Sequence, residues 1–247
     1  MGAMTFVGCL LTAYSAPAYL TWRHILPQSL RVILMMTGMF IYLLGVFLAS
    51  LFWFAVVPLR QNLWFSIPFS VGFQFLARYA YYRLYMRIGN GINAISDNPA
   101  NKWNGLDYAF VGGHGFGLMS ALVMNAAALA ESLGPAFVPC ASCPSLSSFF
   151  VYAILALYFW YIHILMMPLC MNAFSRQPPR RAIFRVATLY LTQTGASYAT
   201  NLFHNAPGLV AGVGNGGPCS IAFLVMIAIA VGLSFEAWRV LDRATMR

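Results

Sequence analysis

The sequence predicts an all-α, polytopic integral membrane protein with seven transmembrane helices, an N-terminus outside and a C-terminus in the cytosol. Three observations support this prediction. Of the 247 residues, 61% are hydrophobic and only 8% are charged, whereas a soluble domain carries about 25% charged residues. The apolar residues form long runs, and basic residues occupy every second gap between them. Lipid must therefore be the main solvent of a single membrane domain over residues 1–247.

Seven apolar runs are long enough to cross a hydrocarbon core, which takes about 20 helical residues. The runs are continuous rather than alternating, so helices are expected instead of β-strands. In chain order, the predicted spans are about 3–22, 30–57, 63–82, 107–131, 147–171, 182–203 and 218–240. The first run has no basic region before it and no cleavage site after it, so it is predicted to be a retained span and not a signal peptide.

The basic residues predict the orientation. Arg60 is the only lysine or arginine in the gaps after spans two, four and six. The basic set lies in the gaps after spans one, three, five and seven or at the span ends that border them: Arg23, Arg31, Arg83, Arg87, Lys102, Arg176, Arg180, Arg181, Arg185, Arg239, Arg243 and Arg247. The positive-inside rule places this set in the cytosol, which puts the N-terminus outside. Topology thus accounts for the net charge of +9, and no nucleic-acid partner is expected.

Cysteines cluster in the gap at 132–146, which this topology places in an oxidising compartment. Cys140 and Cys143 could form a disulfide with each other, or one of them with Cys219 near the start of the last span. Free thiols are the remaining alternative.

Carboxylates are few and lie in loops or near the ends of spans. They are Asp97, Asp107, Glu131, Glu236 and Asp242. An intramembrane aspartyl protease needs two carboxylates that share a proton, so this chain is not predicted to be such a protease.

A metal-dependent membrane hydrolase is an alternative, with His114, His163 and His204 as ligands. No two of these histidines are close in sequence, and His114 and His204 are expected at different membrane depths. A small transporter or receptor is a further alternative, although no segment indicates a ligand pocket. No metal or other cofactor is predicted.

Small and polar residues inside the spans indicate helix packing. Gly113, Gly117 and Ala121 recur every four residues, which lets a second helix approach closely, within the chain or in a partner. In span three, Arg78 could snorkel to the cytosolic side and could also face a polar interior with Gln74 one turn before it, and both can hold together. His163, in span five, is expected to hydrogen-bond a neighbouring helix.

Several motifs occur in an order that resembles a known family. They are Met1-Gly2-Ala3 with Phe6, Gly8 and Cys9; Leu30–Ile33 followed by Gly38, Phe40 and Leu43; Leu48–Ser50 with Trp53 and Phe54; Gln74, Arg78 and Ala80–Leu84; the small-residue repeat of span four with Leu133–Pro135; and His163. This pattern, over about residues 1–205 and loosely to 240, is similar to the anterior-pharynx-defective (Aph) subunit of γ-secretase.

The sequence departs from that family at several positions. Phe75 stands where the family has an acid beside Gln74, and Ala121 replaces the third glycine of the repeat. Gly195 aligns with a span-six histidine, so the missing hydrogen bonds would have to come from nearby polar residues. Those candidates are Gln193, Thr194 and Ser197. The chain is therefore identified as a divergent member.

The resemblance implies a non-catalytic scaffold that stabilises a presenilin-type aspartyl protease and a nicastrin-type glycoprotein, with a small fourth membrane subunit. It implies membranes from the endoplasmic reticulum and Golgi to the plasma membrane or endosomes. Gly113, Gly117 and Ala121 are then expected to make the close packing that assembly needs. His163, Arg78 and Gln74 are expected to line a polar interior. A role of these residues in internal folding alone is the alternative.

Overall fold

The computed structural model describes residues 2–56, 63–95, 105–134, 138–140, 143, 146–175, 179–201 and 217–245. Within these ranges the chain forms seven long α-helices and one short π-helical turn. They are α1 (Gly2–Leu20), η1 (Thr21–Ile25), α2 (Ser29–Ala55), α4 (Leu63–Ile95), α5 (Gly105–Glu131), α6 (Ser148–Phe174), α7 (Pro179–Asn201) and α9 (Gly217–Thr245).

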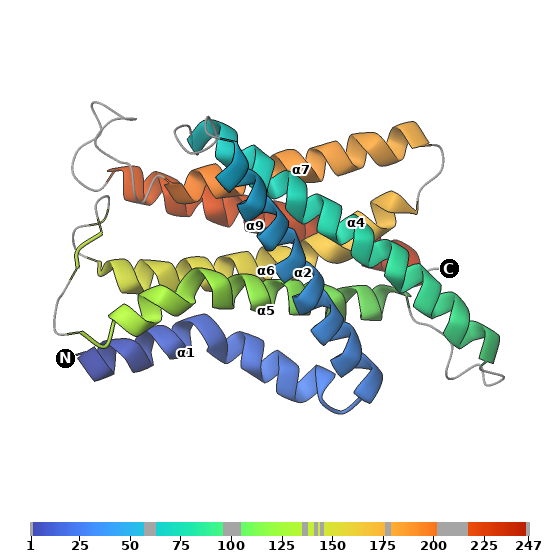
Figure 1. Cartoon of the computed structure of the whole chain (residues 1–247), viewed down its shortest axis with the longest axis horizontal. Coiled ribbons are helices and arrows are strands. Elements are labelled where there is room, and N and C mark those ends of the chain that lie inside the picture. The colour runs from blue at the N-terminus through green and yellow to red at the C-terminus, as the bar shows by residue number, and fades with distance from the viewer. Residues whose placement is uncertain are drawn as a thin grey trace.

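The helices run back and forth, and the two ends of the chain lie at opposite ends of the bundle, as an odd number of crossings requires (Figure 1). The predicted all-α polytopic class is confirmed. The direction in which the bundle crosses the membrane stays a prediction.

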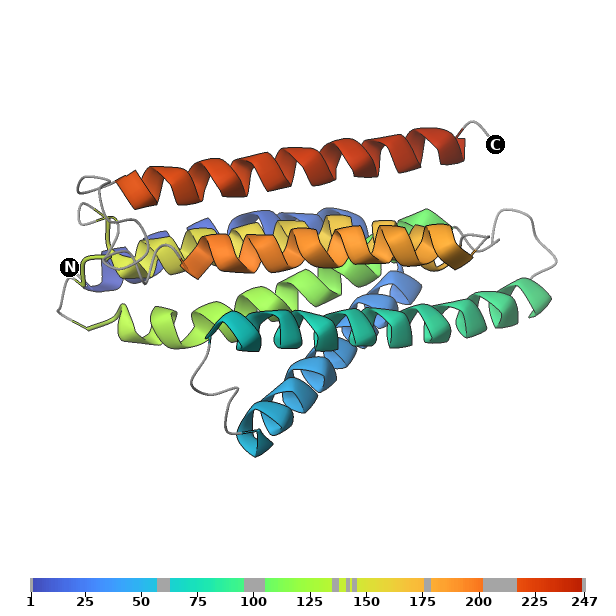
Figure 2. The ribbon, with the colours of Figure 1, turned by 90° about the horizontal axis from the view of Figure 1, so that it is seen from above.

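Helices α5 and α6 form the centre of the bundle. In their most apolar stretches, 50% and 56% of the residues are buried inside the protein, against 17% for α1 and for α9. Figure 2 shows α2 crossing the bundle obliquely, while α9 lies along its edge. The two central helices are therefore the part of the chain on which the other helices are positioned.

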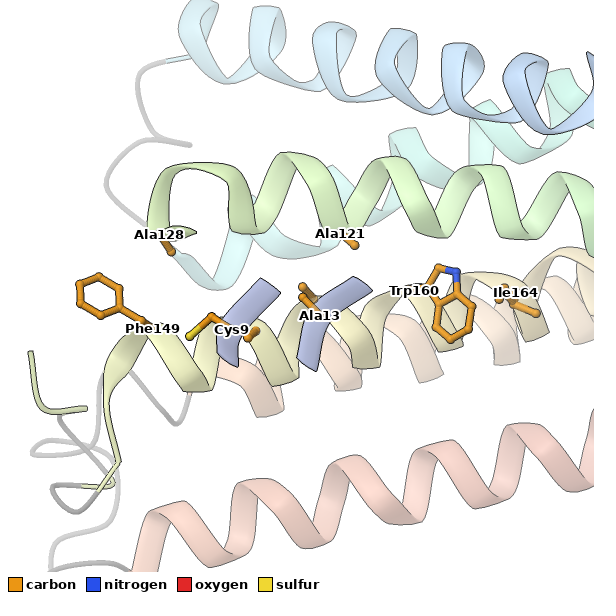
Figure 3. Packing of buried hydrophobic residues seen from close by; sticks show 9 residues of the cluster. Cys9, Ala13, Ala121, Ala128, Phe149, Trp160 and Ile164 are labelled. Carbon is orange, nitrogen blue, oxygen red and sulfur yellow. The ribbon is translucent and has the colours of Figure 1, made fainter. Parts of the chain in front are cut away.

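Small side chains allow α1, α5 and α6 to pack closely. A buried cluster joins these helices and consists of Cys9, Ala13, Ala121, Ala128, Phe149, Ala153, Ala156, Trp160 and Ile164 (Figure 3). Alanine and cysteine side chains bring helix backbones near each other, which gains van der Waals contact where lipid offers no hydrophobic driving force. Phe149 and Trp160 supply the bulk of this cluster.

Five of the described helical stretches are long and apolar enough to cross a membrane: Gly2–Ile25, Ser29–Ala55, Gly105–Glu131, Ser148–Phe174 and Cys219–Asp242. Helices α4 and α7 are of sufficient length but more polar. Their polar side chains include Gln74, Arg78 and Gln193, which contact one another inside the bundle. The two helices thus share a polar interior, and both also carry exposed arginines, Arg83 and Arg87 on α4 and Arg180 and Arg181 on α7.

Helix α4 is longer than the sequence predicted. It continues to Ile95, well beyond the predicted span at 63–82 and into the gap before the predicted span at 107–131. At about 1.5 Å per residue, its 33 residues exceed the roughly 30 Å of a hydrocarbon core. Arg83 and Arg87 are exposed on this last part of the helix, so the helix can extend beyond the hydrocarbon without burying their charges.

Candidate functional site

Arg78 lies at the centre of a buried polar cluster formed by α4, α6 and α7. Its side chain is fully buried, so it does not snorkel to the surface. The guanidinium Nη1 donates to Oε1 of Gln193 over 2.7 Å. Nη2 donates to Nδ1 of His163 over 2.6 Å. One arginine therefore links three helices that are far apart in the sequence.

Gln193 extends the cluster to Gln74. Its Nε2 donates to Oε1 of Gln74 over 2.5 Å, while its own Oε1 accepts from Arg78. These two bonds fix the orientation of the Gln193 amide, because a guanidinium can only donate. Among the three residues that the sequence offered as replacements for the missing histidine, Gln193 is the one that bonds Arg78.

His163 is neutral in this arrangement. Since Arg78 has no acceptor, Nδ1 of His163 must accept, and the ring proton lies on Nε2. The rings of Tyr42 and Phe116 surround the imidazole, with centroids 5.5 and 6.3 Å away. The predicted hydrogen bond from His163 to a neighbouring helix is thus present, and its partner is the buried arginine.

No carboxylate is among the bonded partners of Arg78 in the described part of the chain. Its charge lies instead over two aromatic rings, 4.9 Å from the centroid of Phe75 and 5.8 Å from that of Phe116. Such cation–π contacts stabilise a desolvated cation by about 2 kcal/mol. A buried charge is costly unless its hydrogen bonds are made, so the cluster ties the stability of the bundle to the positions of α4, α6 and α7.

Two glycines of α5 let it pack directly on the backbone of α6. A Cβ added to Gly113 would lie 2.8 Å from Cβ of Met167 and 3.0 Å from the carbonyl oxygen of His163. A Cβ at Gly117 would lie 2.6 Å from the carbonyl oxygen of Trp160. Ala121, the third residue of the repeat, is fully buried. The predicted small-residue face is therefore a contact within this chain.

The opposite side of α5 packs against α2 and α4 in the same way. A Cβ at Gly115 would collide with the carbonyl oxygen of Met35, and one at Gly112 with the ring of Tyr81. On α2, the carbonyl oxygen of Gly112 lies so close to Gly38 that a Cβ added to Gly38 would be 2.7 Å from it. Helix α5 thus packs closely on two sides, against backbone atoms at Gly113, Gly115 and Gly117 and against the Tyr81 side chain at Gly112.

The sequence model of the Aph-1 protein family matches residues 4–236. This chain belongs to the Aph-1 family. It is 33% identical over 130 residues to the γ-secretase subunit Aph-1 of Drosophila melanogaster, which covers 53% of this chain and 54% of that protein.

Two further relatives give the range of similarity. The γ-secretase subunit APH-1B of Mus musculus is 34% identical over 148 residues, 56% of this chain and 57% of that protein. The APH1-like γ-secretase subunit of Arabidopsis thaliana is 23% identical over 178 residues, 69% of this chain and 71% of that protein. The chain thus matches little more than half the length of the animal relatives, as befits a divergent family member.

A second buried histidine of this family member has a role that the sequence did not predict. Nε1 of Trp160 donates to Nδ1 of His114 over 3.2 Å. The proton of His114 therefore lies on Nε2, which donates to Oγ1 of Thr21 over 2.8 Å, and Thr21 donates to the carbonyl oxygen of Pro17. This chain of bonds joins α5, α6 and the start of η1.

A salt bridge at the predicted cytosolic end also escaped the sequence analysis. Nη2 of Arg31 contacts Oδ2 of Asp107 at 2.6 Å, and Nη1 of Arg31 donates to the carbonyl oxygen of His24. The two charged side chains are 17% and 22% exposed. The bridge fixes the start of α2 against the start of α5. Opposite charges at two predicted span starts were its only signal in the sequence.

The cysteine pairing is one of the alternatives that the sequence left open. Cys143 forms a disulfide with Cys219, with their Cα atoms 5.5 Å apart, a separation that suits a disulfide. The pair Cys140–Cys143 is therefore not the one formed, and the alternative with Cys219 is correct. The reason is tertiary: the start of α9 packs against the segment that precedes α6, a contact that sequence spacing cannot reveal.

The histidine–metal alternative receives no support from these contacts. Both ring nitrogens of His114 are used in hydrogen bonds to Trp160 and Thr21. Within the ranges that the structure covers, no three His, Cys, Asp or Glu side chains are grouped so that they could hold a metal ion. His204 lies outside the described residues.

Proposed function

We propose that this chain is a non-catalytic scaffold subunit of a γ-secretase-type intramembrane aspartyl protease. In this role it stabilises a presenilin-type protease and a nicastrin-type glycoprotein, together with a small fourth membrane subunit. Membership of the Aph-1 family and relatives named as γ-secretase subunits support the proposal. Processing of membrane proteins by the assembled complex would then depend on this chain without any chemistry of its own.

The placement of the carboxylates supports a role without catalysis. Asp107 is bound to Arg31, and Glu236 lies 3.5 Å from Arg239 near the C-terminal end of α9. Glu131 is the last residue of α5. None of these acids lies beside another at the middle of a helix, whereas aspartyl catalysis needs two adjacent carboxylates. Asp97 lies outside the described residues.

The observation that carries the proposal is the rigid centre of the bundle. The glycine contacts of α5 and the buried Arg78 cluster fix α2, α4, α6 and α7 relative to one another. The outer helices meanwhile expose large apolar side chains, among them Phe47 and Phe54 on α2 and Trp238 on α9. Holding such surfaces in fixed positions lowers the entropic cost of binding other transmembrane helices, which is what a scaffold must do.

Reconstitution tests the proposal. The chain is co-expressed with a presenilin-type protease, a nicastrin-type glycoprotein and the small fourth subunit in cells that lack their own Aph-1 protein. Cleavage of a single-span reporter substrate is expected only when all four chains are present. Cleavage by this chain alone, or equal cleavage by the other three without it, would contradict the proposal.

A further inference from the structure

Three cysteines meet at one end of the bundle. Cys140 and Cys143 are buried in one apolar cluster, and Cys219 at the start of α9 packs against it. Cys143 and Cys219 are joined by a disulfide across 76 residues of sequence, whereas Cys140 is not part of a disulfide. A thiol and a disulfide therefore share one buried cluster.

The backbone holds Cys140 beside Cys143. The N–H of Cys140 donates to the carbonyl oxygen of Leu146 over 3.0 Å, and the N–H of Leu146 donates to that of Cys143 over 2.8 Å. The backbones of both cysteines thus bond the same residue, Leu146. The two-residue spacing between them is also the spacing at which neighbouring cysteines commonly form a disulfide.

We propose that Cys140 is the internal nucleophile of a thiol–disulfide exchange that releases the start of α9. The Cys140 thiol loses its proton, and its sulfur attacks Sγ of Cys143. A Cys140–Cys143 bond forms while the Cys143–Cys219 bond breaks. The electron pair of the broken bond leaves on Sγ of Cys219, which takes up a proton. One disulfide replaces another, so no external oxidant or reductant is consumed, and the reverse attack by Cys219 restores the first bond.

Burial favours this internal exchange over reaction with external thiols. Cys140 and Cys143 are only 3% and 2% exposed, so a reductant from solution has little access to the disulfide, while the Cys140 thiol is already in the cluster. Exchange rates depend strongly on access to the sulfur that is attacked.

The consequence concerns α9, one of the two least buried of the apolar spans. The disulfide is its covalent tie to the segment before α6. After exchange, the start of α9 loses this covalent bond and keeps its non-covalent contacts, which include the apolar cluster of Ala222 and Met226 with Val151 and Leu155. The exchange is thus a switch between a tethered and a released end of a peripheral helix.

Alkylation of the full-length chain in mild detergent at pH 8 tests the proposal. Native protein and a Cys140→Ser variant are incubated with N-ethylmaleimide, acid-denatured and mapped by mass spectrometry. We expect alkylated Cys219 together with a Cys140–Cys143 disulfide in the native chain, and at least tenfold slower alkylation of Cys219 in Cys140→Ser. Equal alkylation of Cys219 in both proteins would overturn the proposal. So would an intact Cys143–Cys219 bond in the native chain throughout the incubation.

A second variant tests separately whether the sulfurs of Cys140 and Cys143 reach each other. In Cys219→Ser incubated with oxidised glutathione, which takes up the two electrons, the thiols of Cys140 and Cys143 should be recovered as a Cys140–Cys143 disulfide. Amide hydrogen exchange at the start of α9 should also be faster in this variant than in Cys140→Ser, which keeps the tether. Recovery of Cys140 and Cys143 as two thiols would show that their sulfurs do not reach each other, and would overturn the proposal.

Discussion

Replacing Gly117 with alanine tests whether α5 packs directly on the backbone of α6. The new Cβ would lie 2.6 Å from the carbonyl oxygen of Trp160 and 3.0 Å from its Cα. A carbon and a non-bonded heavy atom are comfortable at about 3.5–4.0 Å, so the two helices would have to separate by roughly 1 Å. The change therefore acts on backbone atoms, which cannot rotate out of the way.

The expected cost follows from overpacking. Adding a methyl group to a well-packed site costs about 1–3 kcal/mol, and alanine recovers up to about 1 kcal/mol through its better helix propensity. Gly232→Ala in α9 measures this second contribution separately, because a Cβ there meets nothing within 4 Å. We expect Gly117→Ala to be about 2 kcal/mol less stable than Gly232→Ala. Gly117→Leu should lose more, since a branched side chain has no space at all.

Reversible unfolding of the purified chain in mixed micelles measures these differences, with far-UV circular dichroism as the signal. Recovery of the assembled complex on a native gel should decrease in the same order: Gly232→Ala, Gly117→Ala, Gly117→Leu. Equal stability of the two alanine variants would refute the argument that α5 and α6 are in backbone contact. Full recovery of the complex with Gly117→Leu would refute the link between this contact and assembly.

Three further predictions concern the polar contacts. His163→Ala should lower the free energy of unfolding by about 2–3 kcal/mol, because it leaves a charged donor of Arg78 unpaired. Adding Arg78→Met to this variant should recover most of the loss. Unfolding of the single and double variants measures both effects. Asp107→Asn should lower the free energy of unfolding by about 1 kcal/mol through loss of the salt bridge to Arg31. Unfolding at low and high salt should show that high salt removes this contribution from the native chain and leaves the variant unchanged. Trp160→Phe should cost about 1 kcal/mol by removing the donor to His114, whereas a loss within error of zero would show that this bond adds nothing.

Much of the architecture could be predicted from the sequence because membrane crossing imposes strong constraints. Long apolar runs and alternating basic gaps predicted seven helices, and seven are present in the described ranges. The cost of a buried charge likewise marked Arg78 as a residue that needs partners. Gln193 was among the three residues that the resemblance to the Aph family offered as replacements for the missing span-six histidine, and it bonds Arg78.

The partners themselves could not be predicted, since they depend on how the helices face one another. Helix α6 is apolar over nearly its whole surface and is buried on most sides, so its pattern does not show which side meets α5. His114 bonds Thr21 across 93 residues, and Cys143 meets Cys219 across 76. Such long-range contacts follow from the three-dimensional packing of helices, for which a single sequence carries no local signal.

Affinity purification from native membranes in mild detergent tests the central claim most directly. The tagged chain is isolated and everything that co-purifies with it is quantified by mass spectrometry, with a Gly117→Leu chain as the matched control. The scaffold account predicts a presenilin-type protease and a nicastrin-type glycoprotein in stoichiometric amounts with the native chain, and far less with the variant. A native chain recovered alone, or with partners unrelated to an intramembrane protease, would contradict it.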